Sequence, residues 1–133
     1  MIKLIVGTKG TGKTKKMIEM INAVTKTTSG NVVVVEKSMQ LTYDIDHAAR
    51  LVDLEEYEVA GYDMMYGFVA GMLAGNYDIT ELFIDGILKT CDHDLNGLGG
   101  FLDKLAVLTK DINVTVTISA DESVLPEDVK KYL

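Results

Sequence analysis

The sequence predicts an α/β protein, a three-layer sandwich in which helices cover both faces of a mostly parallel, five-stranded sheet. Two observations lead to this fold class. Short runs of apolar and β-branched residues alternate along the chain with segments whose apolar residues recur at helical spacing. A glycine-rich loop also stands between the first apolar run and the first helical segment. With 133 residues, the chain is expected to form one domain spanning residues 1–133.

The glycine-rich loop is the most informative stretch of the chain. It is Gly7-Thr8-Lys9-Gly10-Thr11-Gly12-Lys13-Thr14, and it fills every fixed position of the phosphate-binding pattern G-x-x-x-x-G-K-[ST]. Residues 1–6 before it are mostly apolar and predict a buried strand. Residues 15–24 after it carry apolar side chains along one face of a helix, namely Met17, Met20, Ile21 and Val24. The pattern therefore occurs between a strand and a helix, which is the context it requires.

Each residue type in this loop has a chemical reason. Glycines let the backbone turn tightly and present N–H groups to a phosphate with no Cβ in the way. The helix N-terminus that follows also favours an anion. Lys13 can reach the β- and γ-phosphates of a nucleotide, and the Thr14 hydroxyl can ligate Mg²⁺. The predicted nucleotide-binding residues of this region are Gly7, Thr8, Lys9, Gly10, Thr11, Gly12, Lys13, Thr14 and Lys15.

Four further segments complete the predicted sheet. They cover residues 32–36, 50–54, 81–85 and 114–119, the second of them being a weakly patterned edge strand. Three of these strands end in polar side chains, Glu36, Asp85 and Ser119. Because α/β sheets bind ligands at the carboxyl ends of their strands, these three residues are predicted to lie at the site.

The remaining helices are expected over residues 61–75, over residues 98–108 and after Pro126. In the first of them Gly67, Gly71 and Gly75 recur every four residues. We expect this small-residue face to pack closely on the sheet, with a contact between subunits as the alternative.

Two polar segments are expected to be loops. Residues 39–49 predict a loop or one irregular turn. Residues 90–97 contain Cys91, His93 and two acids but lack the four-ligand spacing of a structural zinc centre. We therefore expect residues 90–97 to form a polar loop near the mouth of the ligand site.

The loop and the strand that ends in Asp85 together resemble the P-loop NTPases, over most of the chain and as a minimal core. Within that superfamily the chain looks more similar to the RecA-like, additional-strand branch. The resemblance implies that Asp85 ends the Walker B strand and holds the Mg²⁺ shell together with Thr14. It also implies a strand order of 1–6, 114–119, 82–85, 32–36 and 50–54. The loop strand would then lie at a sheet edge, where a partner subunit could cover it.

The departures from this family pattern matter for the expected activity. Many members place a glutamate directly after the Walker B aspartate, but this chain has Gly86 there. Glu36 then remains to orient the attacking water, so Lys13, Glu36 and Asp85 are the predicted catalytic residues. RecA-like ATPases usually borrow a cation from a neighbouring subunit, a role that would fall to Arg50 or Lys37.

The leading interpretation is an ATP-binding protein that is Mg²⁺-dependent, with slow or partner-stimulated hydrolysis. ATP is favoured over GTP because a guanine-specifying N-K-x-D motif is missing. A small-molecule, nucleoside-type kinase is the alternative, because the strand, loop and first helix also resemble class II thymidine kinase. Against it, this chain has neither an acid after Asp85 nor a lid segment. A third interpretation is a non-catalytic module in which nucleotide controls assembly through the Gly67, Gly71 and Gly75 face.

Composition limits the partners and the compartment. The net charge of −7 argues against a general nucleic-acid binder, and residues 1–16 hold five lysines and no acid. The single cysteine, Cys91, excludes an internal disulfide and suits a reducing compartment. The sequence shows no signal-peptide pattern and no apolar run long enough to span a membrane, so a cytoplasmic protein is expected, with a homo-oligomer or a protein partner possible.

Overall fold

The structure, a computed structural model, describes residues 1–38 and 44–133. Within these residues the chain forms one five-stranded sheet, ordered β1-β5-β4-β2-β3, in which every neighbouring pair is parallel. The strands are β1 (Ile2–Gly7), β2 (Asn31–Glu36), β3 (Ala49–Asp53), β4 (Ile79–Asp85) and β5 (Asn113–Ser119). The predicted fold class, an α/β three-layer sandwich with a parallel five-stranded sheet, and the predicted strand order are both confirmed.

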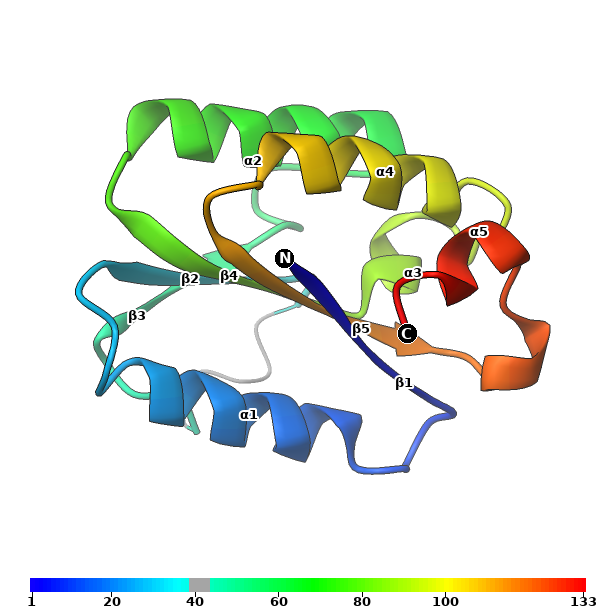
Figure 1. Cartoon of the computed structure of the whole chain (residues 1–133), viewed down its shortest axis with the longest axis horizontal. Helices are drawn as coiled ribbons and strands as arrows, with labels where there is room; N and C mark the ends of the chain where they lie inside the picture. Colours follow the sequence, from blue (N-terminus) through cyan, green and yellow to red (C-terminus); the bar gives the residue numbers. More distant parts are fainter. Residues whose placement is uncertain (39–43) are drawn as a thin grey trace.

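Helices form a layer on each face of the sheet (Figure 1). Helix α1 (Lys13–Val24) covers one face, and α2 (Tyr62–Gly75) and α4 (Leu98–Leu108) cover the other. Because strand side chains alternate between faces, each strand serves both cores. On β4, Leu82 and Ile84 pack in the core under α2 and α4, while Phe83 packs with α1. This alternation also assigns Asp85, two residues beyond Phe83, to the α1 face.

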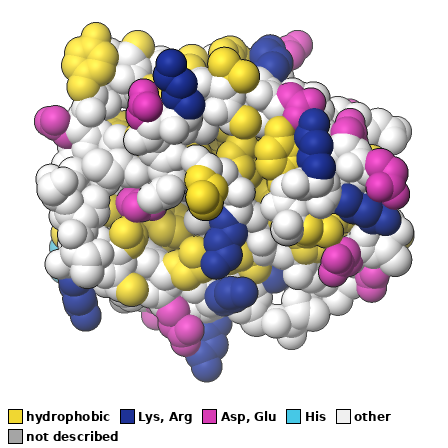
Figure 2. Space-filling model, viewed as in Figure 1, with side chains coloured by type: hydrophobic (Ala, Val, Ile, Leu, Met, Phe, Trp, Pro, Cys, Tyr) yellow, Lys and Arg dark blue, Asp and Glu magenta, His cyan; other side chains and the backbone are white. Residues whose placement is uncertain are grey.

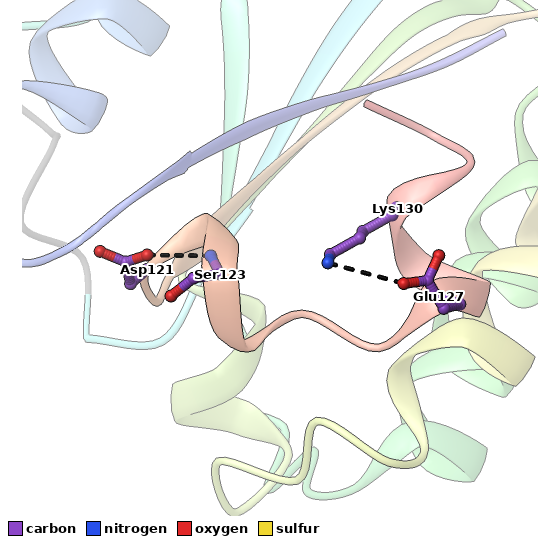
Figure 3. Close-up of polar contacts among 4 residues, drawn as sticks. All are labelled: Asp121, Ser123, Glu127 and Lys130. Atoms are coloured by element: carbon purple, nitrogen blue, oxygen red, sulfur yellow. Dashed lines mark hydrogen bonds and ion pairs between the residues drawn. The ribbon is translucent and has the colours of Figure 1, made fainter.

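Three short helices lie at the carboxyl end of the sheet or beyond it. They are α3 (Ile87–Thr90), the 3₁₀ turn η1 (Glu122–Val124) and α5 (Glu127–Lys130), which begins after Pro126 as predicted. Figure 3 shows the local contacts of the last two: the Ser123 N–H donates to the Asp121 carboxylate at 2.9 Å, and Lys130 pairs with Glu127 at 3.6 Å. The sequence did not predict α3, because four residues are too few to show helical periodicity.

The expected packing of the α2 glycines on the sheet is wrong. Met65 and Val69 form the fully buried face of α2, whereas Gly67, Gly71 and Gly75 are exposed. A Cβ at any of the three glycines would meet nothing within 4 Å. The segment is apolar nearly all round, so the sequence pattern does not show which face is buried. In the structure the bulky side chains, and not the glycines, pack on the sheet.

The polar turn after α1 contains Gly30, which lies against the start of β4 rather than at the end of the helix. Helix α1 ends at Val24, so Gly30 does not terminate it. A Cβ on Gly30 would lie 2.4 Å from the carbonyl oxygen of Asp78 and 2.2 Å from Cγ2 of Thr80. Glycine is therefore required here because the chain passes directly against the start of β4.

The segment between β2 and β3 is described only in part. Residues 39–43 of the predicted loop lie outside the described residues, and residues 44–48 form turns. The weak edge strand predicted at residues 50–54 is confirmed as β3, parallel to β2. None of the helices in the part of the chain that the structure describes is long and apolar enough to cross a membrane.

The strand β1 lies at an edge of the sheet, as the strand order required. A cavity of about 420 Å³ follows this edge beside Leu4, Ile5 and Val6 and reaches Lys13. Figure 2 shows charged side chains of both signs scattered over the face viewed there, with apolar patches between them. That face therefore carries no continuous basic surface.

Candidate nucleotide site

The glycine-rich loop joins β1 to α1, and glycine geometry shapes it. Gly10 and Gly12 have φ angles of +84° and +86°, in the left-handed region that side chains disfavour. The N–H and the hydroxyl of Thr11 both donate to the carbonyl oxygen of Thr8, at 3.3 Å and 2.7 Å. A Cβ on Gly7 would lie 2.4 Å from the Thr11 hydroxyl. Gly7, Thr8 and Thr11 thus define the shape of the loop.

Lys13 is the first residue of α1, and its side chain is only 9% exposed. Its Nζ donates to the carbonyl oxygen of Thr8 at 2.9 Å. The side chain therefore turns back along the loop, so the ammonium lies beside the loop backbone. A cation in this place can neutralise phosphate oxygens that accept from the loop amides.

A cavity of about 530 Å³ lies between this loop and the carboxyl ends of β4 and β5. Most of the predicted site residues line it: Lys9, Gly10, Gly12, Lys13, Thr14, Lys15, Asp85 and Ser119. The structure therefore gathers residues from three separate segments of the chain around one space.

The carboxylate of Asp85 is fixed by a residue that the sequence did not point to. The Thr117 hydroxyl donates to Oδ1 of Asp85 at 2.6 Å and accepts from the Gly86 N–H at 2.7 Å. Thr117 is 1% exposed and also lines the cavity. The alternation of β5 offered a signal, since Thr117 precedes Ser119 by two residues and shares its face.

Ser119, one of the predicted site residues, lines the cavity. It ends β5 directly opposite Gly7, which is the last residue of β1 and the first residue of the glycine-rich loop. Glu36 ends β2 directly opposite Asp85 and is 6% exposed. Adjacent strands are about 4.8 Å apart, so the two acids are neighbours on the α1 face. Glu36 is nevertheless not among the described residues that line the cavity.

Lys89 and His93 also line the cavity, and neither was named among the predicted binding residues. Both follow the turn after β4, where Gly86 has a φ angle of +65° and α3 begins. Within residues 90–97, which were expected to form a polar loop near the ligand site, His93 lines this cavity. The described residues contain no group of three or more His, Cys, Asp or Glu side chains that could hold a metal on their own.

The two cations considered for transition-state stabilisation lie elsewhere. Arg50 is the second residue of β3 and pairs with Val33, well before the carboxyl end of the sheet. It lines a different cavity, of about 310 Å³, with Tyr57, Phe68 and other residues of β3 and α2. Lys37 follows β2, is exposed, and is also not among the described residues lining the loop cavity.

Comparison with known proteins shows that this chain is similar to them in its fold and not in its sequence. No protein-family model matches the chain, and no curated protein matches its sequence. Among solved structures, the pCW3 conjugation coupling protein TcpA, in its monomer form with ATPγS, superposes with a TM-score of 0.61 at 14% sequence identity. The match covers 98% of this chain and 46% of that protein, so this chain spans less than half of its neighbour. The solved-structure match thus agrees with the confirmed α/β fold with its parallel sheet.

Proposed function

We propose that this chain binds Mg²⁺ and a nucleoside triphosphate, ATP in the first place, at the loop of residues 7–14. The observation that carries the proposal is the shared cavity: residues 9, 10 and 12–14 of a complete phosphate-loop pattern line the same space as Asp85. That the TcpA structure contains ATPγS adds support, since the folds superpose over nearly all of this chain.

The residues present fit Mg²⁺ as a companion of the phosphates. Mg²⁺ prefers hard oxygen ligands and commonly takes only one or two from the protein, the rest coming from phosphates and water. The Thr14 hydroxyl and the Asp85 carboxylate are such oxygens, and both line the cavity. We assign them as the residues that hold the ion, which when bound neutralises charge on the β- and γ-phosphates.

The proposed activity is slow or partner-stimulated hydrolysis of ATP. Lys13 and the loop amides bind and orient the phosphates, and Thr117 holds the Asp85 carboxylate in one orientation. Gly86 supplies no carboxylate next to Asp85, and Glu36 is the nearest acid in the adjacent strand. Because Glu36 lies beside the cavity rather than in its lining, we expect it to orient water poorly without a partner.

Phosphate release from Mg-ATP over a range of protein concentrations tests this function, with Lys13→Ala as the blank. We expect low turnover that disappears in Lys13→Ala. Turnover that rises per molecule with concentration would indicate a site completed between subunits. Turnover equal in the two proteins would contradict hydrolysis at this loop.

A further inference from the structure

Lys89 lines the same cavity as the glycine-rich loop but comes from a different segment of the chain. It belongs to α3, just after the turn that follows Asp85, whereas the other lining lysines, Lys9, Lys13 and Lys15, belong to the loop and the start of α1. Its Cδ and Cγ atoms lie 3.5 Å and 3.8 Å from the position that a Cβ on Gly86 would take. The aliphatic part of Lys89 therefore runs along the backbone next to Asp85.

The charge of Lys89 is not neutralised by the carboxylates of the described part of the chain. The ion pairs there are Lys130–Glu127 and Lys131–Asp103, and neither involves Lys89. Among the described residues that line the cavity there are four lysines and a single carboxylate, that of Asp85. Like charges around one space repel each other, and an anion carrying several charges relieves that repulsion. The surplus matches a polyphosphate better than a singly charged ligand.

We infer that Lys89 contacts the terminal phosphate of the bound triphosphate, an inference that rests on the proposed function. The phosphate loop and its lysine cradle the β-phosphate, and the metal ligands Thr14 and Asp85 mark where the β- and γ-phosphates meet. Lys89 lines the same cavity from α3, four residues after Asp85, and we place its ammonium on the γ side of the ion. Its ammonium thus supplies, from the same chain, the cation that Arg50 and Lys37 are badly placed to supply.

This position has a consequence for specificity. A nucleoside diphosphate fills the loop and meets Lys13 but has no γ-phosphate for Lys89. A charge-assisted hydrogen bond to a phosphate is among the stronger polar contacts in proteins. Lys89 therefore favours triphosphate over diphosphate, and its positive charge lies where negative charge spreads over the γ-phosphoryl oxygens during transfer.

Equilibrium binding of Mg-ATPγS and Mg-ADP to wild type, Lys89→Ala and Lys89→Arg tests this inference. Lys110→Ala is the matched control, because Lys110 is exposed and lies near the amino end of β5, at the opposite end of the strand from the site. Lys89 is exposed as well, so its removal leaves the core intact. We expect Lys89→Ala to weaken ATPγS by about tenfold and ADP by less than about twofold. Lys89→Arg retains most of the preference, and Lys110→Ala changes neither affinity.

Equal weakening of the two nucleotides by Lys89→Ala, or no weakening of either, would overturn the inference. Binding of the two nucleotides to Lys13→Ala shows whether the inference about Lys89 has failed or the proposed nucleotide site itself has failed. If wild type binds both nucleotides and Lys13→Ala binds neither, the proposed nucleotide site is supported. The affinities of Lys89→Ala then decide whether Lys89 contacts the terminal phosphate. If wild type binds neither nucleotide, the proposed function is wrong and the role of Lys89 falls with it.

Discussion

The Thr117 hydroxyl donates a 2.6 Å hydrogen bond to Oδ1 of Asp85 and accepts a 2.7 Å hydrogen bond from the Gly86 N–H. One buried side chain of β5 thus sets both the orientation of the carboxylate and the path of the backbone directly after it. The turn at Gly86 directs the chain into α3 and so positions Lys89. Thr117 therefore acts on the site through Asp85 and Gly86.

Replacing Thr117 by valine keeps the shape of the side chain and removes both hydrogen bonds. We expect the free energy of unfolding to fall by about 1–3 kcal/mol, because the Gly86 N–H loses its partner. We also expect half-saturation with ATPγS to require several times more Mg²⁺, since Asp85 is no longer oriented. Titration with Mg²⁺ at fixed ATPγS measures this second effect, which a loss of stability alone does not produce.

Thr115→Val is the control for this prediction. Thr115 is also buried in β5 and lies on the same α1 face as Thr117. It lies two residues earlier in the strand, further from the carboxyl end where the cavity is. An equal rise in the Mg²⁺ requirement of Thr115→Val and Thr117→Val would contradict a specific role of Thr117 in orienting Asp85.

Replacing Gly67 or Gly30 by alanine is expected to change the free energy of unfolding in opposite directions. Gly67→Ala is expected to raise the free energy of unfolding by about 0.5–1 kcal/mol, because the helical position is exposed and has room for a Cβ. Gly30→Ala is expected to lower it, because the new Cβ meets the Asp78 carbonyl oxygen at 2.4 Å. Urea denaturation of the two variants checks both signs. Loss of stability in Gly67→Ala would mean that the α2 glycine face is packed against another surface.

The Cys91 thiol is expected to be unreactive in the folded protein. Its side chain is 2% exposed, and burial together with the nearby charges of Asp92 and Asp94 raises the pKa of Cys91 to about 12. The thiolate is the nucleophile, so alkylation by iodoacetamide at pH 8 should become rapid only after unfolding. Rapid alkylation of the folded chain, followed by mass spectrometry, would contradict this burial.

The same shift predicts how stability changes with pH. Between the ordinary pKa of 9.0 and about 12, folded Cys91 keeps its proton while unfolded Cys91 releases it. The folded state then binds more protons, so stability is complete below pH 9.0 and falls as the pH rises above it. The drop in unfolding free energy from pH 8 to pH 10 should be smaller in Cys91→Ala than in wild type.

The strands of the sheet could be predicted from the sequence because the glycine-rich loop pattern of residues 7–14 identifies the strand before it and the helix after it. The complete loop pattern fixed β1 and α1, and the resemblance to RecA-like cores then ordered the other strands. It predicted Asp85 and Ser119 as site residues because the carboxyl ends of parallel strands meet at one edge. These features depend on local patterns and topology, which a single sequence can show.

The cavity-lining residues that the sequence did not predict depend on geometry instead. Thr117 is one of several β-branched residues inside β5, and only its contact with Asp85 distinguishes it. Lys89 reaches the cavity because Gly86 turns the chain into a four-residue helix that has no periodic pattern. The face of α2 was predicted wrongly because its apolar residues surround the helix, so packing rather than pattern decided which side was buried.

The central claim is that a nucleoside triphosphate binds at the loop of residues 7–14, and calorimetric titration with Mg-ATPγS tests it most directly. Wild type and Lys13→Ala are compared, with thermal unfolding to show that both are folded. We predict saturable binding at one site per chain in wild type and a loss of at least about a hundredfold in affinity in Lys13→Ala. Equal affinity in the two proteins, or no binding by folded wild type, would contradict the account.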